Sequence, residues 1–141
     1  MLENLNTLTE CDLPLIEDEL SNKIIGACIE VHKTLGGPGL LESIYEAALC
    51  HELKLRGLRI QQQKPVQVIY KGESIKEPLF IDILVEGKVL IEVKATEKNH
   101  PIYETQILTY LKLSNLKLGL LVNFGATYVK NGISRVINGN L

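Results

Sequence analysis

The sequence predicts one α/β domain in which helices flank a mixed β-sheet, and three observations support that fold class. The 141 residues, 45% hydrophobic and 23% charged, suit a single globular domain with a buried core. Apolar residues recur at helical spacing early in the chain and at every second position afterwards. We therefore expect the order α-α-β-β-β-α-β-β, with residues 1–16 as a flexible arm before a domain of residues 17–141.

Two helices are expected at the start of the domain. The first covers residues 18–35, where apolar positions repeat every three or four residues, and it ends at the Gly-Gly-Pro-Gly stretch of residues 36–39. The second covers residues 40–56 and ends at Gly57, a residue type that favours the position after a helix.

The later elements follow from period-two patterns and from the turn residues between them. Strands are expected at residues 60–70, 79–85, 89–95, 117–124 and 127–137. A third helix is expected over residues 101–113, because proline is favoured at the first position of a helix.

Charge and cysteine content exclude several classes of protein. Residues 1–30 hold seven acids and one base, whereas residues 31–141 hold fourteen bases and ten acids. The overall pI of about 5.9 argues against tight non-specific DNA binding, which usually needs a domain pI above about 9. No apolar run approaches the ~18 residues of a membrane span, so we expect no membrane partner. Cys11, Cys28 and Cys50 form no C-x-x-C pair, which fits a reducing cytoplasm.

Three charged residues interrupt strands that are otherwise apolar. Asp82 lies between two isoleucines, and Glu92 and Lys94 are separated only by Val93. Period two places Glu92 and Lys94 on one face of their strand. Burying a carboxylate costs several kcal/mol unless a cation or hydrogen bonds compensate it, so this placement needs a reason.

The hairpin loop decides whether Asp82 joins that face. A two-residue loop, Glu86-Gly87, would pair Val85 with Lys88 and would place Asp82 and Glu92 on opposite faces. We favour a three-residue loop that begins at Val85, pairs Leu84 with Lys88 and puts Asp82 opposite Leu90. Glu92 is then the diagonal neighbour of Asp82 at roughly 7–8 Å, with Ile81, Ile83, Ile91 and Val93 on the other face.

Two carboxylates and a lysine suit metal-dependent phosphodiester chemistry. Magnesium is commonly held by one or two acids together with water and substrate phosphates. A neighbouring lysine can orient or deprotonate the attacking water, or stabilise developing charge. The alternative is an ion pair of Lys94 with Asp82 or Glu92 on a solvent-facing side of the sheet, and the pattern alone does not choose between the two readings.

The same residues resemble a known family. Asp82, followed on the next strand by Glu92-Val93-Lys94, resembles the signature of the PD-(D/E)XK nuclease superfamily, although Ile81 stands where that signature has proline. The segment Gly39-Leu40-Leu41-Glu42-Ser43-Ile44-Tyr45 resembles the motif of the GxxExxY protein family, a branch of that superfamily. Residues 24–36 and Asn123-Phe124-Gly125 are also similar to that branch, so the resemblance covers about residues 20–138.

The resemblance implies a restriction-endonuclease-like fold and assigns roles to particular residues. It implies that Asp82 and Glu92 bind Mg²⁺ or Mn²⁺, that Lys94 is the catalytic lysine, and that Glu42 completes the metal site. Tyr45 would support the site, and Gln106 with Tyr110 would brace it and contact the nucleic-acid backbone. Glu42 could equally be an exposed acid of a first helical turn, and Tyr45 a core aromatic.

The expected function is metal-dependent hydrolysis of nucleic-acid phosphodiester bonds, with DNA favoured over RNA as partner. A homodimer is possible. Two rival functions stay open: a nuclease-fold binding or scaffolding module with a vestigial site, and a metal-dependent hydrolase of a small phosphorylated molecule.

Overall fold

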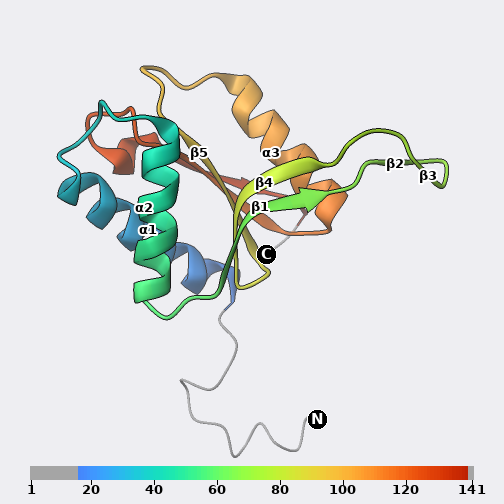
Figure 1. The fold of residues 1–141 in the computed structure, drawn as a ribbon, viewed down its shortest axis with the longest axis horizontal. Coiled ribbons are helices and arrows are strands. Elements are labelled where there is room, and N and C mark those ends of the chain that lie inside the picture. The colour runs from blue at the N-terminus through green and yellow to red at the C-terminus, as the bar shows by residue number, and fades with distance from the viewer. Residues whose placement is uncertain (1–15, 140–141) are drawn as a thin grey trace, which may run out of the picture.

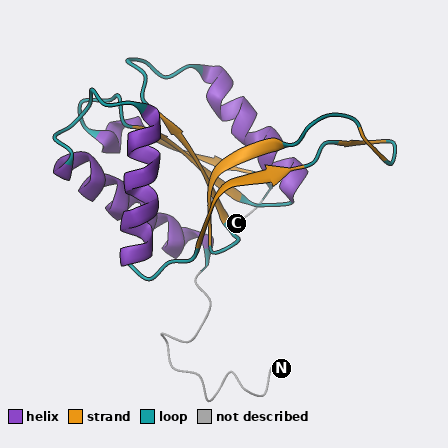
Figure 2. Ribbon diagram, in the orientation of Figure 1, coloured by secondary structure: helices purple, strands orange, loops and turns teal. Residues whose placement is uncertain are grey.

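The computed structural model describes residues 16–139, which form a five-stranded sheet between two helical layers (Figures 1 and 2). In chain order the elements are α1 (Glu17–Thr34), α2 (Glu42–Leu55), β1 (Ile60–Val66), β2 (Ile69–Tyr70), β3 (Glu73–Ser74), β4 (Leu79–Val85), β5 (Val89–Lys94), α3 (Pro101–Ser114), β6 (Leu118–Asn123), the 3₁₀ helix η3 (Val129–Gly132) and β7 (Ile133–Ile137). The sheet order is β1-β4-β5-β6-β7; β5 and β6 run parallel, and the other neighbours are antiparallel.

The predicted mixed α/β fold class is confirmed. The expected arm of residues 1–16 and Cys11 lie outside the described residues except for Ile16, which precedes α1. No helix among residues 16–139 is long and apolar enough to cross a membrane.

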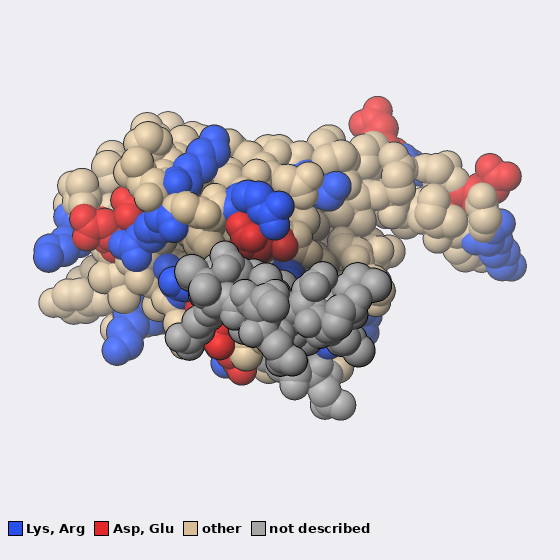
Figure 3. Space-filling model, turned by 90° about the horizontal axis from the view of Figure 1, so that it is seen from below, with Lys and Arg blue, Asp and Glu red and all other residues tan. Residues whose placement is uncertain are grey.

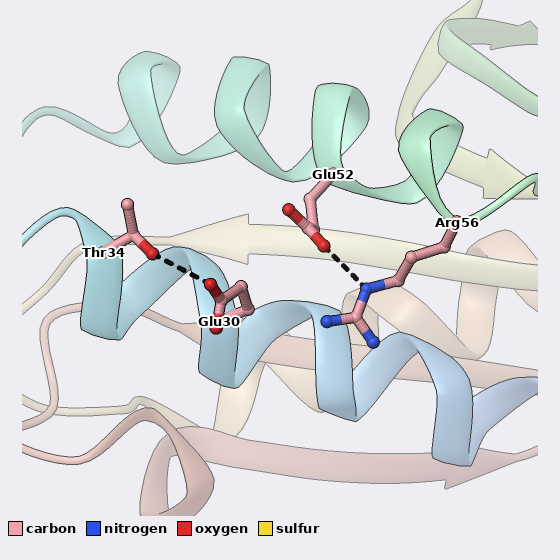
Figure 4. Close-up of polar contacts among 4 residues, drawn as sticks. All are labelled: Glu30, Thr34, Glu52 and Arg56. Carbon is pink, nitrogen blue, oxygen red and sulfur yellow. Dashed lines mark hydrogen bonds and ion pairs between the residues drawn. The ribbon is translucent and has the colours of Figure 1, made fainter.

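Helices α1 and α2 pack together on one face of the sheet and enclose the larger core. Its fully buried side chains include Leu20, Ile24, Tyr45, Leu49, Leu53, Ile83, Ile91 and Phe124. On the outer side, Arg56 pairs with Glu52 at 2.7 Å, one turn back along α2, and Thr34 donates to Glu30 within α1 (Figure 4). Exposed pairs of this kind contribute little to stability, so burial of the apolar faces holds the two helices in place.

Helix α3 covers the opposite face and begins and ends with specific caps. The His100 side chain accepts the amide of Ile102 at the start, and Asn115 adopts the left-handed conformation at the end. Beneath the helix, Gly119 of β6 lies against Ile107 and Leu111. The lack of a side chain at Gly119 is what lets α3 approach the sheet this closely.

Two predicted strands are shorter in the structure because their partners end. Strand β1 stops at Val66, which pairs with Leu79, the first residue of β4. The chain beyond it forms a separate projecting hairpin, β2–β3 (Figure 1), and not the predicted continuous strand to Tyr70. Likewise the ladder of β6 with β7 ends at the pair Val122 and Ile133, and the residues before Ile133 form η3 (Val129–Gly132) in place of the first part of the predicted strand.

The predicted register of the β4–β5 hairpin was wrong: each β4 residue pairs with the residue two positions further along β5 than predicted. Val85 pairs with Val89, so the three loop residues are 86–88 and not 85–87. The reason lies at Arg59, which precedes β1. Its amide donates to the Glu86 carboxylate, its guanidinium pairs with the same carboxylate at 3.2 Å, and its carbonyl accepts the Glu86 amide. These contacts hold Glu86 against Arg59, next to β1. Val85, which is fully buried, is then the last β4 residue that pairs with β5 before the loop.

The contact between α3 and Gly119 generates a stability prediction. A Cβ at Gly119 would lie 2.5 Å from Ile107 Cγ2, so Gly119→Ala should lower the free energy of unfolding by about 1–3 kcal/mol through overpacking. Denaturant unfolding measures the change.

The matched control is the same substitution in an Ile107→Ala background. There the new methyl enters vacated space, and we expect Gly119→Ala to be neutral or stabilising. An equal loss in both backgrounds would contradict this account of the α3 contact.

Candidate active site

Asp82 and Glu92 meet where strands β4 and β5 separate. The last ladder pair is Ile83 with Ile91, and the next position brings Asp82 opposite Glu92. The Asp82 carboxylate accepts the Val93 amide at 2.9 Å, and the Asp82 amide lies 3.4 Å from Glu92 Oε1. The shifted hairpin register therefore brings the two acids closer than the diagonal arrangement that the sequence suggested.

Lys94 lies on the α3 side of the sheet. Its Nζ is 4.6 Å from the centre of the Tyr103 ring, over which it makes a cation–π contact. Tyr110, two turns further along α3, is half-buried. Burial raises the pKa of its hydroxyl, and the charges of Glu92 and Asp82 add to the rise. Gln106 is exposed on the turn between these two tyrosines.

The expected alternation of side chains along β4 fails at Asp82. Ile83 packs in the α1–α2 core as predicted, but Ile81 packs on the α3 side with Leu84 and Leu90. Two local features account for the change of face. Strand β4 leaves its ladder with β5 at Asp82, and Gln63, the β1 residue opposite Asp82, has a φ of +52°.

Gln63 connects Asp82 to a second buried acid, Glu46 of α2. The Gln63 amide nitrogen lies 3.1–3.2 Å from both Glu46 oxygens and 3.2 Å from Asp82 Oδ1. Gln62 donates to Glu46 at 2.7 Å. The Glu46 residue is only 8% exposed, so these two amides solvate its carboxylate. A positive φ at a non-glycine strand residue costs of order 1–3 kcal/mol, and here it aims one side chain at two carboxylates.

Burial and crowding of like charges set the electrostatics of the site. Burial, assisted by the charge of Asp82, raises the pKa of the Glu92 carboxyl to about 8. Burial also raises the pKa of Asp82, with Glu46 adding to the effect and the Val93 amide opposing it. Glu42 lies at the start of α2, and burial raises its pKa, although Lys94 opposes the rise and Asp82 and Glu46 add to it.

Tyr45 holds the loop that leads to Glu42. It is fully buried and stacks on Phe124 with 4.6 Å between ring centres. Its hydroxyl donates to the Gly37 carbonyl at 2.7 Å and accepts the Leu40 amide at 3.1 Å. Tyr45 is therefore a core aromatic whose hydroxyl fixes the residues just before Glu42.

Asn123 fixes the chain that follows Lys94. Its Oδ1 accepts the amides of Thr96 and Gly125, and its Nδ2 donates to Asn99. A Cβ at Gly125 would collide with the Thr96 backbone, so glycine is required for this close approach. Asn123 and Gly125 thus clamp the ends of the parallel strands β5 and β6 together.

Residues 18–136 match a protein-family model described as the PD-(D/E)XK nuclease superfamily. The chain belongs to this superfamily. Comparisons with curated proteins and with solved structures gave no significant match. The five-stranded mixed sheet with helices on both faces agrees with the restriction-endonuclease-like fold that the PD-(D/E)XK resemblance implied.

PD-(D/E)XK nucleases typically use divalent metals, and the donor set here fits one. Asp82 and Glu92 offer two adjacent carboxylates whose pKa values are raised, first by burial and then by the charge of a neighbouring acid. Among residues 16–139, no group of three or more His, Cys, Asp or Glu side chains is arranged to hold a metal ion. The site thus has the two-acid form that Mg²⁺ accepts when water and phosphate complete its shell, and a ligand role for Glu42 stays a prediction.

Sequence reasoning missed three residues of this PD-(D/E)XK site: Glu46, Gln63 and Tyr103. Helical spacing could have found two of them, because Glu46 is one turn after Glu42 and Tyr103 is two turns before Tyr110. Gln63 carries no such signal, since its role depends on an unusual backbone conformation that the residue type does not predict.

The raised pKa of Glu92 makes stability depend on pH in metal-free solution. The folded chain holds this proton more tightly than the unfolded chain, whose carboxyl titrates near 4.5. The stabilisation that comes from the protonated Glu92 carboxyl is therefore complete below pH 4.5, and it is lost as pH rises through about 8. In EDTA, we expect Glu92→Gln to raise Tm relative to wild type more at pH 8 than at pH 5.

The control is Glu97→Gln, which changes an exposed acid in the loop after β5. It should shift Tm by nearly the same small amount at both pH values. A pH-independent effect of Glu92→Gln in thermal melts would contradict the expected titration of Glu92 in the folded chain.

Proposed function

We propose that this chain is a metal-dependent nuclease that hydrolyses nucleic-acid phosphodiester bonds. The observation that carries the proposal is the pair of facing carboxylates, Asp82 and Glu92, with Lys94 two residues along β5. Membership of the PD-(D/E)XK nuclease superfamily supports the nuclease reading. In this proposal the chain belongs to the GxxExxY branch, which the motif of residues 39–45 supports. It prefers DNA over RNA and works in a reducing cytoplasm.

Each residue has a defined part in the proposed reaction. Mg²⁺ or Mn²⁺, when bound, would polarise the phosphate and lower the pKa of a bound water. Asp82 and Glu92 hold the cation, and the Val93 amide and Gln63 keep the Asp82 carboxylate oriented. Lys94 would orient the attacking water as an ammonium, or take its proton as the neutral amine, and Tyr103 limits the positions that Nζ can take.

The remaining predicted site residues act around this centre. Glu42 is a third acid within electrostatic reach of Asp82 and Lys94, and it completes the metal shell in the proposal. Tyr110 and Gln106 lie on α3 on the same side as Lys94, where they brace the site and contact the backbone of the substrate. Tyr45 acts indirectly by fixing the loop before Glu42.

A nuclease-fold binding module is the second candidate, and the net charge of −2 and the pI of about 5.9 favour it. On the visible part of the face drawn in Figure 3, Lys and Arg alternate with Asp and Glu and form no continuous basic surface. Electrostatic binding of a long duplex normally uses such a surface. The two functions differ in their requirement for Lys94, which a binding module does not need for turnover.

Metal binding is the first test. We expect calorimetry to detect about one or two weak Mn²⁺ or Mg²⁺ sites per chain in wild type, and loss of that heat in Asp82→Ala. Because Glu92 must release its proton first, affinity should rise as pH increases towards 8. Glu97→Ala removes the same charge from a nearby exposed position and should bind like wild type. Equal heats in wild type and Asp82→Ala would refute the metal site.

The second test separates an enzyme from a structural ion pair. We expect Lys94→Ala to stay folded in Mg²⁺, to retain metal binding, and to lose roughly 10²–10⁴-fold in cleavage of labelled DNA or RNA. Lys117→Ala, at the opposite end of the β5–β6 pair, is the control and should cleave normally. If Lys94 only neutralises the acids, the variant should instead be destabilised by a few kcal/mol whether or not metal is present. A wild type inactive on every nucleic acid would favour the binding module.

A further inference from the structure

A cavity of about 630 Å³ lies between α1 and η3, away from the Asp82 and Glu92 carboxylates. Its walls come from the end of α1, from Gly36 and Gly37 of the following loop, and from residues 127–131 after β6. Figure 1 shows the α1–α2 loop and η3 at the same end of the molecule. The volume is in the range of small-molecule sites. We infer that this cavity is a nucleotide subsite, which takes the base and phosphate of one nucleotide of the substrate strand.

Phe124 connects the cavity to Lys94 at the end of β5. Phe124 donates its amide to the Lys94 carbonyl at 2.8 Å. Its own carbonyl accepts from Nε2 of His32 at 3.0 Å, and His32 lines the cavity. Because β5 and β6 are parallel, Lys94 and the chain leading to η3 leave the sheet at the same end, where both strands finish. Lys94 projects on the α3 side of the sheet and the cavity lies on the α1 side, so a single strand bound at Lys94 would reach the cavity by crossing this end of the sheet.

The charge of the cavity is opposite to that of the carboxylate site. Lys33 contributes from α1 and Lys130 from η3, and both are exposed. None of the residues that line the cavity is acidic, although the whole chain has a net charge of −2. Two lysines on facing walls favour an anion such as a phosphate group over a cation.

Tyr128 contributes an aromatic ring to the same cavity. Tyr128 is 71% exposed, immediately before η3, and Ile29 on the α1 wall is 41% exposed. Aromatic side chains beside basic ones are the usual means of holding single-stranded nucleic acid, because every base offers a face for stacking. A nucleotide is the ligand that uses the ring, the apolar wall and the lysines together. The inference rests on the proposed nucleic-acid substrate.

Titration with a mononucleotide tests the subsite without any cleavage step. We expect deoxyadenosine monophosphate in EDTA to bind wild type saturably, with one site per chain by calorimetry. Tyr128→Ala should weaken this binding about tenfold or more, while Tyr128→Phe, which keeps the ring, should stay within about twofold. The double substitution Lys33→Ala, Lys130→Ala should also weaken binding.

Two controls match these variants in residue type. Tyr70→Ala removes an exposed tyrosine from the β2–β3 hairpin, and Lys117→Ala removes an exposed lysine from the opposite edge of the sheet. Both should bind the nucleotide like wild type. Absence of saturable binding, or binding that Tyr128→Ala leaves unchanged, would overturn the subsite. So would inorganic phosphate binding as tightly as the nucleotide.

Cleavage kinetics separate this inference from the proposed function. If wild type cuts nucleic acid, Tyr128→Ala should raise KM for a single-stranded oligonucleotide and leave kcat nearly unchanged. Cleavage with an unaltered KM would keep the nuclease and reject the subsite. Nucleotide binding that follows the expected pattern in a chain that cuts nothing would keep the subsite and reject the nuclease.

Discussion

The hydrogen bond from the Val93 amide to the Asp82 carboxylate is the contact on which the arrangement of the site depends. It lies one step beyond the last ladder pair, so a side chain bridges β4 and β5 where the backbone ladder has ended. This contact fixes Asp82 beside Glu92, although the two half-buried carboxylates repel each other when both are ionised. The register that permits it is set at the other end of the hairpin by the contacts between Arg59 and Glu86.

The repulsion between these acids explains the polar contacts around them. Gln63 adopts an unfavourable backbone conformation and shares its amide between Asp82 and Glu46. Such strain persists only where the surrounding structure over-determines it. Burial, with the charge of Asp82 adding to it, raises the pKa of Glu92 to about 8. A bound divalent cation would relieve the repulsion, which is why the geometry supports metal chemistry more than a simple ion pair.

The carboxyl ends of β5 and β6 are held by Tyr45 of α2 and by Asn123 of β6. On one face, Tyr45 stacks on Phe124 and its hydroxyl fixes the loop before Glu42. At the edge itself, Asn123 binds the amides of Thr96 and Gly125. Rigid support of this kind is what a catalytic lysine needs, because small displacements of a reacting group are costly in rate. The cavity beside His32 shares this support, since Phe124 contacts both Lys94 and His32.

The sequence by itself determined the fold class and singled out the acids and the lysine of the candidate site. Periodicity was sufficient for α1, α2, α3 and the buried strands, because burial of one face imposes a repeat that residue types reveal. Charged residues inside apolar strands marked Asp82, Glu92 and Lys94 for the same reason. Only the tertiary structure decided the ends of β1 and the start of β7, because a strand ends where its partner ends. It alone decided the hairpin register, which depends on Arg59, 27 residues away from Glu86. It also brought Glu46 and Gln63 to Asp82, since their meeting requires the packing of α2 over β1 and a backbone angle that no local pattern specifies.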